Sequence, residues 1–430
     1  MKIIRLPTQK FIPETFNQDR LSSLIYILIT LSPIVFFTYE RAFGEWYKLI
    51  SILCVTSLII QKDIINFNWR NNKLSLMIFV IYPVVILINQ LLRWDWHIHE
   101  YLDKLRFLFA IPIFIYLSEK KFNFMGILEK SLPIALILSY VSTNLFFLDR
   151  QYGDRFTDLF LNPIYYGEIT LSMSMILLAT FFISHNKNIY INCLKVIGFL
   201  MGIYISVKTG SRTGWENLII IPILLILFKR KNLKTEYQLL FLLLFMAGLI
   251  LLIKYNQTVS LRLSQAYLEI KNYPWSGGMA PVTSVGQRIT FYRIGWDLML
   301  KEPWYGWGQK GYGGLLLRPE LLSFSAKETL LMTYYAHFHN ELLTLIVWYG
   351  VFGPIIYLIN FIFPVVNAIK VLKTQIVNEV TKNNSLILIV FLVTQIVAGL
   401  SDMVILFKYM IMFYSFMMAC LLASVHKKEI

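Results

Sequence analysis

Charged residues are scarce in this 430-residue chain: Asp, Glu, Lys and Arg together make up 15% of it, whereas hydrophobic residues make up 57%. The mean hydropathy is correspondingly high, at +0.59. Repeated runs of about 17 to 22 apolar residues match the roughly 30 Å hydrocarbon core of a bilayer. The runs are solidly apolar and do not alternate, which excludes a transmembrane β-barrel. The sequence therefore predicts an all-α protein that crosses a membrane many times.

Cysteine is rare as well, with Cys54, Cys193 and Cys420 all inside apolar runs. Because they share no metal-like spacing, neither a disulfide nor a zinc site is expected. No group of Asp, Glu, His or Cys has ligand spacing on the outer side, so we expect no metal and no other cofactor. The glycine-rich run 306–314 lacks a Gly-Lys-Ser/Thr that opens a helix, which excludes a P-loop.

Lys and Arg exceed Asp and Glu by 40 to 25, which gives a formal net charge of +15. Most of the basic residues lie in short connectors between apolar runs, where they orient the chain in the membrane, so no nucleic-acid partner is expected. The segment Met1 to Arg20 is polar and basic, which is not the pattern of a cleavable signal. Alternate connectors are the more basic ones, so the N- and C-termini are predicted to be cytoplasmic.

About twelve spans are predicted. They cover about 21–39, 46–61, 74–92, 105–117, 127–148, 164–184, 190–207, 215–228, 237–253, 341–369, 385–400 and 403–424. We expect one integral membrane domain over residues 1–430, with the long polar segment 254–340 inserted outside the cytoplasm between the ninth and tenth spans. Four further polar clusters fall on that same side: Arg93 to Lys104, Asp154-Arg155, Lys208 to Gly214, and Ser401-Asp402. Clustered on one side, they indicate a shared polar cavity, although anchoring at the membrane interface is an alternative for each.

Arg212 is the first candidate site residue. It lies between Gly210 and Gly214 in a tight connector, where the glycines allow the backbone to turn sharply. A guanidinium offers donors in a fixed fork, which suits a phosphate better than a lysine does. Interfacial anchoring is the alternative.

A second candidate is Arg288, in a predicted amphipathic helix over 286–301. The apolar residues of that segment recur at helical spacing: Ile289, Tyr292, Trp296 and Met299. Arg288 lies in the first turn at the edge of this stripe, where free amides and the helix dipole add to its attraction for an anion. Arg293 lies on the opposite face, so Arg288 is the preferred ligand.

His339 is the third candidate. It precedes Asn340, a good N-cap for the next span, and an imidazole at a helix N-terminus tends to be neutral, as a general base must be. His337 is its competitor, and Phe338 between them makes it unfavourable for both to point the same way on a helix. Asn162-Pro163 reads as an N-cap with proline at the first helical position. Arg106, at the mouth of the fourth span, is either an anchor or an anion contact.

Taken in order, these segments resemble the bacterial O-antigen ligase and polymerase superfamily, multi-span inner-membrane glycosyltransferases with a large periplasmic loop late in the chain. The resemblance covers most of the length as a hydropathy pattern. It is carried by Ser211-Arg212-Thr213-Gly214, by Arg288 through Trp296 to Pro303 with Gly306-Trp307-Gly308, and by His339-Asn340-Glu341-Leu342-Leu343 followed by Gly350 and Gly353. Two further segments resemble the ligase branch of this superfamily: Asp103-Lys104-Leu105-Arg106, and Arg155-Phe156 with Asn162-Pro163-Ile164-Tyr165-Tyr166-Gly167.

The resemblance implies a GT-C-like membrane protein of a Gram-negative inner membrane, with its active site in the periplasm. Its donor would be a glycan on undecaprenyl pyrophosphate, its acceptor lipid A-core, and its other partners membrane lipids. Arg212 and Arg288 match the arginines that contact the pyrophosphate, and His339 matches the base, while His337 is a departure. Arg155 and Arg106 are further expected substrate contacts. A polymerase that extends a lipid-linked glycan, a protein-glycosylating relative and a lipid-linked oligosaccharide transporter are the alternatives.

Overall fold

The computed structural model describes residues 19–37, 40–61, 67–120, 122–146, 151–152, 155–156, 162–184, 188–229, 235–316, 318–335 and 337–425. In chain order the helices are α1 (Arg20–Phe36), α2 (Glu40–Gln61), α4 (Trp69–Arg93), α5 (Ile98–Lys104), η2 (Leu105–Phe109), α6 (Ala110–Ser118), α7 (Phe124–Val141), η3 (Ser142–Phe146), α8 (Pro163–Ile183), α9 (Ile189–Lys208), α10 (Asn217–Lys229), α11 (Thr235–Tyr255), α12 (Gln257–Lys271), α13 (Ser284–Lys301), η4 (Gly313–Leu315), α14 (Pro319–Leu322), α15 (Lys327–Tyr335), α16 (Glu341–Tyr349), α17 (Phe352–Tyr357), η5 (Leu358–Ile362), α18 (Phe363–Lys373), α19 (Glu379–Ala398) and α20 (Lys408–Val425). Apart from these, the described residues contain a two-residue antiparallel pair, β1 (Gln151–Tyr152) with β2 (Arg155–Phe156). The all-α prediction is confirmed.

Among the described residues, eight helices are long and apolar enough to cross a membrane. They are Ala42–Gln61, Trp69–Arg93, Phe124–Asn144, Pro163–Ile183, Ile189–Lys208, Phe352–Lys373, Glu379–Ala398 and Lys408–Val425. Shorter apolar helices cover Arg20–Phe36, Asn217–Phe228 and Phe245–Tyr255. The predicted span 105–117 is instead η2 followed by the nine-residue α6. A multi-span membrane protein is therefore confirmed, but the count of twelve is not.

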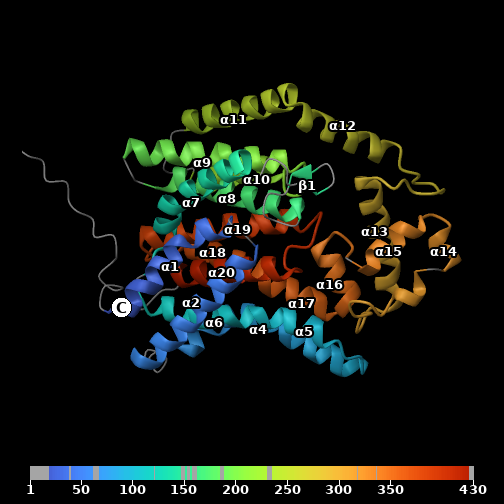
Figure 1. Cartoon of the computed structure of the whole chain (residues 1–430), viewed down its shortest axis with the longest axis horizontal. Helices are drawn as coiled ribbons and strands as arrows, with labels where there is room; N and C mark the ends of the chain where they lie inside the picture. The colour runs from blue at the N-terminus through green and yellow to red at the C-terminus, as the bar shows by residue number, and fades with distance from the viewer. Residues whose placement is uncertain are drawn as a thin grey trace, which may run out of the picture.

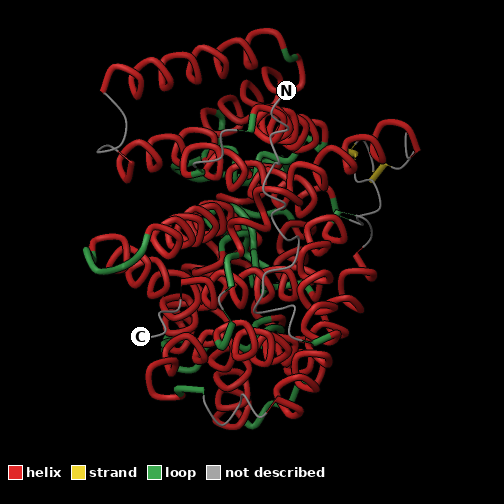
Figure 2. Tube along the Cα trace, turned by 90° about the vertical axis from the view of Figure 1, so that its left-hand side faces the viewer, coloured by secondary structure: helices red, strands yellow, loops and turns green. Residues whose placement is uncertain are grey.

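The helices form three layers (Figure 1). In that view α18, α19 and α20 lie in the middle, with α7 to α10 above them and α2, α4 and α6 below. Pairs such as α8 with α19 and α6 with α20 are in contact across the layers. α11 is the uppermost helix of Figure 1, and in Figure 2, turned by 90°, the top of the molecule again stands apart from the rest. The polar segment forms α12 to α15, and α13 to α15 gather at one end of the layers beside α16 (Figure 1).

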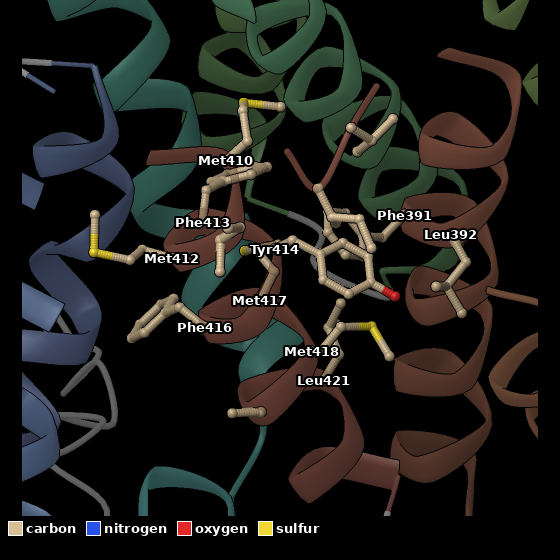
Figure 3. Packing of buried hydrophobic residues seen from close by; sticks show 14 of the residues in the cluster. Phe391, Leu392, Met410, Met412, Phe413, Tyr414, Phe416, Met417, Met418 and Leu421 are labelled. Carbon is tan, nitrogen blue, oxygen red and sulfur yellow. The ribbon is translucent and has the colours of Figure 1, made fainter. Parts of the chain in front are cut away.

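α20 forms the centre of the core. It is apolar on every side, as a membrane span can be, but all of its residues except the first are buried, so protein surrounds it. Phe391 of α19 packs against Phe413 and Tyr414 of α20, with ring centroids 6.1 and 5.8 Å apart (Figure 3). Because lipid is as apolar as a leucine, association between spans depends on close packing, and methionine fills irregular gaps between helices well. The middle layer therefore supplies a rigid base for the connections at its ends.

The glycine-rich run packs against the end of α16. The amides of Trp307 and Gly308 donate to the carbonyls of Val347 and Trp348, both at 2.8 Å. Gly350 has a φ of +57°, and a Cβ there would lie 2.3 Å from the carbonyl oxygen of Trp304. The glycines of this segment thus allow two stretches of backbone to approach closely. This close approach explains why the run is rich in glycine although it is not a phosphate-binding loop.

Gly350→Ala is expected to lower the free energy of unfolding by about 3 kcal/mol, because the backbone is strained for an L-residue and Trp304 must move. Thermal unfolding of the purified protein in detergent would measure this. Gly314→Ala is the matched control, since a Cβ at Gly314 meets nothing within 4 Å. Equal melting temperatures for the two variants would contradict the close approach.

Candidate active site

The connection between α19 and α20, residues 399–407, is the meeting point of the site. Arg288 Nε donates to the carbonyl oxygen of Ser401 at 3.1 Å. The Tyr292 hydroxyl and the Asn340 amide donate to the carbonyl oxygen of Leu400, at 2.6 and 3.2 Å. Helix α13 and the N-terminus of α16 are therefore both tied to this connection, which we call the α19–α20 connection below.

Both histidines approach the same carboxylate on this connection. The Nε2 atom of His337 lies 3.2 Å from Asp402 Oδ1, and Nδ1 of His339 lies 3.5 Å from the same oxygen. Their ring centroids are 4.3 Å apart. The prediction that Phe338 would separate the two rings is wrong, because these residues precede α16 and are not helical. His339 has a φ of +49°, an uncommon conformation outside glycine that turns its side chain back toward His337.

His337 is locked in one tautomer. Its Nδ1 accepts the backbone amide of His339 at 3.0 Å, so the ring proton must sit on Nε2, facing Asp402. Burial lowers the pKa of His337 to about 3, despite the opposing charge of Asp402. The side chain is only 3% exposed. His337 therefore stays neutral and serves to hold the carboxylate, with both nitrogens engaged inside the protein.

His339 is the reachable imidazole. Its side chain is 16% exposed and stacks on Phe291 with ring centroids 5.3 Å apart. Burial alone would raise the pKa of Asp402, but the facing imidazoles of His339 and His337 and the amide of Met403 hold it at about 2. An ionised carboxylate facing Nδ1 favours a proton there and leaves Nε2 to accept one. His339 thus has the arrangement of a general base oriented by a carboxylate.

Three ligand atoms, one each from His337, His339 and Asp402, lie within 4.8 Å of one another. Sequence spacing gave no sign of this group, because Asp402 comes from a different connection. The donor set does not fit a resident metal, however. A metal on His337 Nε2 would need the ring proton on Nδ1, where the amide of His339 already points its own hydrogen.

Arg212 and Arg288 line one cavity of about 400 Å³ with Ser401 at its edge. The rest of its lining is mostly apolar and comes from α9 to α13: Val207, Thr213, Trp215, Glu216, Leu218, Ile219, Leu249, Ile253, Val259, Leu263, Ala266 and Val285. Two cations beside an apolar channel between helices suit an amphiphile with an anionic head. The predicted pair is thus brought together, and through Ser401 it adjoins Asp402 and the histidines.

A third arginine, Arg262 of α12, lies beside Arg212, whose Nη1 donates to the Arg262 carbonyl at 2.8 Å. Burial lowers the pKa of Arg212, as do the charges of Arg288 and Arg262, while Glu269 opposes them. None of the three guanidiniums has a carboxylate within 4.0 Å in the part of the chain that the structure describes. A bound dianion would relieve this repulsion. The sequence gives no reason to select Arg262, because it is simply a basic residue on a polar helix.

The other predicted arginines lie elsewhere or are not described. Arg106 pairs with Asp103 at 2.6 Å. It is not among the residues that line the cavity. The backbone of Arg155 belongs to β2, but its side chain lies outside the described residues. Arg293 stacks on the Phe324 ring at 4.3 Å, which agrees with the preference for Arg288.

Helix α13 forms as predicted, but its apolar face was misplaced. Phe291, Ile294 and Leu298 are buried, whereas Trp296 is 60% exposed. Gly295 lies on the packed face, where a Cβ would lie 2.8 Å from a methyl group of Leu343.

Comparison with known families matches residues 197–358 to a family model described as O-antigen ligase. The matched segment contains Arg212, Arg288 and His339, whereas Asp402 lies beyond it. A comparison with curated proteins gives no match.

Glu341, the first residue of α16, is fully buried and lies outside the candidate spans. Burial raises its pKa to about 7, although hydrogen bonds from the amides of Val404 and Ile405 and the charge of Lys104 oppose the shift. Below the unfolded pKa of about 4.5, the protonated carboxyl makes its full contribution to the free energy of unfolding. Because the pKa is higher in the folded state, this contribution is lost as the pH rises through about 7.

The melting temperature of the wild-type protein is therefore expected to fall between about pH 5 and about pH 7.5 relative to that of Glu341→Gln, whose side chain cannot ionise. Thermal unfolding of both proteins across this range is the measurement. Parallel curves would mean that Glu341 does not change protonation there.

Proposed function

We propose that this protein is an O-antigen ligase, because residues 197–358 match a family model of that description, which supports a function of the ligase or polymerase type. In this proposal it transfers a glycan from undecaprenyl pyrophosphate to lipid A-core on the periplasmic face of the inner membrane. The observation that carries it is the continuity of the site: Arg212 and Arg288 line one cavity, and Arg288 bonds Ser401, the neighbour of the carboxylate that faces His339.

The arginines form the donor side. The pyrophosphate would sit between Arg212 and Arg288, with Arg262 close by, and the apolar lining would take the first isoprene units of the lipid. Arg288 uses Nε and Nη1 on Ser401 and Ser284, and Arg212 uses Nη1 on Arg262, so each keeps guanidinium donors for phosphate oxygens. Fixed cations stabilise the charge that develops on a leaving phosphate without reorganising.

His339 forms the acceptor side. Its Nε2 would take the proton of the attacking hydroxyl while that oxygen bonds to the anomeric carbon and the bond from this carbon to the phosphate oxygen breaks. The electron pair of the broken bond leaves on undecaprenyl pyrophosphate, held by the arginines. A single displacement of this kind inverts the anomeric centre. Asp402 stabilises the imidazolium that forms, and the proton then passes to solvent through the exposed part of the ring.

A polymerase would run the same chemistry on a different acceptor, the end of another lipid-linked glycan. The similarity of Asp103-Lys104-Leu105-Arg106 and Asn162-Pro163 to the ligase branch is what favours lipid A-core. Purified protein supplied with lipid-linked donor alone, and then with lipid A-core added, distinguishes the two. A ligase consumes donor only when lipid A-core is present, whereas lengthening of the lipid-linked glycan in its absence would establish a polymerase.

In that assay, His339→Ala is expected to lower kcat by on the order of 100-fold or more, because a positioned base contributes about that much to proton transfer. Arg288→Ala should lose activity as well, through the unneutralised leaving group. Arg293→Ala, on the same helix but stacked on Phe324, is the matched control and should keep near-normal transfer. Near-normal transfer by His339→Ala or Arg288→Ala would remove that residue from the mechanism.

Asp402→Asn preserves the size of the side chain but removes the charge that selects the His339 tautomer. We expect kcat to fall on the order of 100-fold while the KM for the lipid-linked donor stays within about threefold. Initial rates over a range of donor concentrations give both constants. An unchanged kcat would show that His339 does not depend on this carboxylate.

A further inference from the structure

Two buried ionisable side chains from distant parts of the chain bind the same stretch of the α19–α20 connection. Glu341 Oε2 accepts the amides of Val404 and Ile405, at 2.7 and 3.4 Å. Lys104 Nζ, at the end of α5, donates to the carbonyls of Ile405 and Leu406, at 3.2 and 2.8 Å. One carboxyl oxygen thus accepts from two successive amides, and an ammonium group donates to two successive carbonyls.

The main chain of α16 adds a third point of attachment. The amide of Glu341 donates to the carbonyl of Gly399 at 2.8 Å. The connection is therefore bound at its start and in its second half, and Asp402 lies between the two points. Since the amide of Met403 also donates to Asp402 Oδ1 at 2.8 Å, the carboxylate has little freedom to turn away from the histidines.

Burying these two ionisable side chains is energetically unfavourable. Lys104 is 2% exposed and Glu341 is fully buried, and removing an ion from water costs several kcal/mol unless good hydrogen bonds compensate. Apolar residues of similar size would fill the same space at lower cost. Apolar residues, however, could not hydrogen-bond the amides and carbonyls of residues 404–406, whereas Lys104 and Glu341 do so.

We propose that Lys104 and Glu341 are positioning residues of the transfer reaction, which hold the α19–α20 connection so that Asp402 orients the His339 imidazole toward the acceptor. The inference rests on the proposed function. Neither residue touches substrate: Lys104 bonds backbone carbonyls of the connection, and Glu341 bonds its amides. Their effect reaches the reaction through the placement of Asp402 and His339, where a displacement of about 1 Å can cost on the order of 100-fold in rate.

The test uses Lys104→Met, Glu341→Leu and Glu341→Gln in the full-length protein. Lys104→Met and Glu341→Leu remove the hydrogen bonds, whereas Glu341→Gln keeps an oxygen that can accept both amides. We expect kcat to fall on the order of 100-fold in Lys104→Met and Glu341→Leu with the donor KM within about threefold. Glu341→Gln should retain at least about ten times the kcat of Glu341→Leu.

The control is the double variant Lys195→Met/Glu129→Gln. These two residues form a buried ion pair between α9 and α7, with Ser184 also donating to Glu129, and neither contacts the α19–α20 connection. A purely structural role for buried charges predicts that this double variant and Lys104→Met lose activity alike. The positioning role predicts that the control keeps kcat within about threefold of wild type.

Three results would overturn the inference: an unchanged kcat in a folded Lys104→Met or Glu341→Leu, a loss confined to donor KM, or an equal loss in the control. Should Lys104→Met fail to fold, the comparison of Glu341→Gln with Glu341→Leu still decides. Wild-type protein that transfers nothing to either acceptor overturns the proposed function and this inference together, whereas active wild type with unaffected variants overturns the inference alone.

Discussion

The structure of the site depends on how the backbone of the α19–α20 connection is satisfied. The connection joins two mostly buried helices at one end of the helical layers, where its amides and carbonyls need protein partners. Those partners come from three directions: Arg288 and Tyr292 of α13, Glu341 of α16, and Lys104 of α5. Because one short stretch of backbone receives all of them, the elements that carry the site are fixed relative to one another.

This constraint explains how a mechanism can be assembled from segments far apart in the chain. The arginines come from the α9–α10 connector and from α13, and the histidines come from the segment before α16. The connection itself supplies Asp402, whose carboxylate determines which nitrogen of His339 can act as a base. A leaving group and an attacking hydroxyl must be held within a few ångströms of each other, and a shared rigid backbone provides that distance.

Much of this was accessible from the sequence. The apolar runs predicted the membrane class, Asn162 and Asn340 cap their helices as predicted, and Arg212 and Arg288 line a common cavity. Other features depend on contacts that no local pattern encodes. Asp402, Lys104 and Arg262 acquire a role only through partners distant in the chain. On the buried face of α13, Gly295 lies close against Leu343, and His339, whose ring meets that of His337, has a positive φ.

The central claim is that one pocket grips a diphosphate and presents the reacting carbon to His339. An experimental structure of the protein with a non-hydrolysable analogue of the lipid-linked donor tests it most directly. We expect both phosphates to contact Arg212 and Arg288, with the anomeric carbon close enough to His339 Nε2, within about 6 Å, for an acceptor hydroxyl to bridge them. Phosphates bound away from these arginines, or a sugar directed away from His339, would contradict the account.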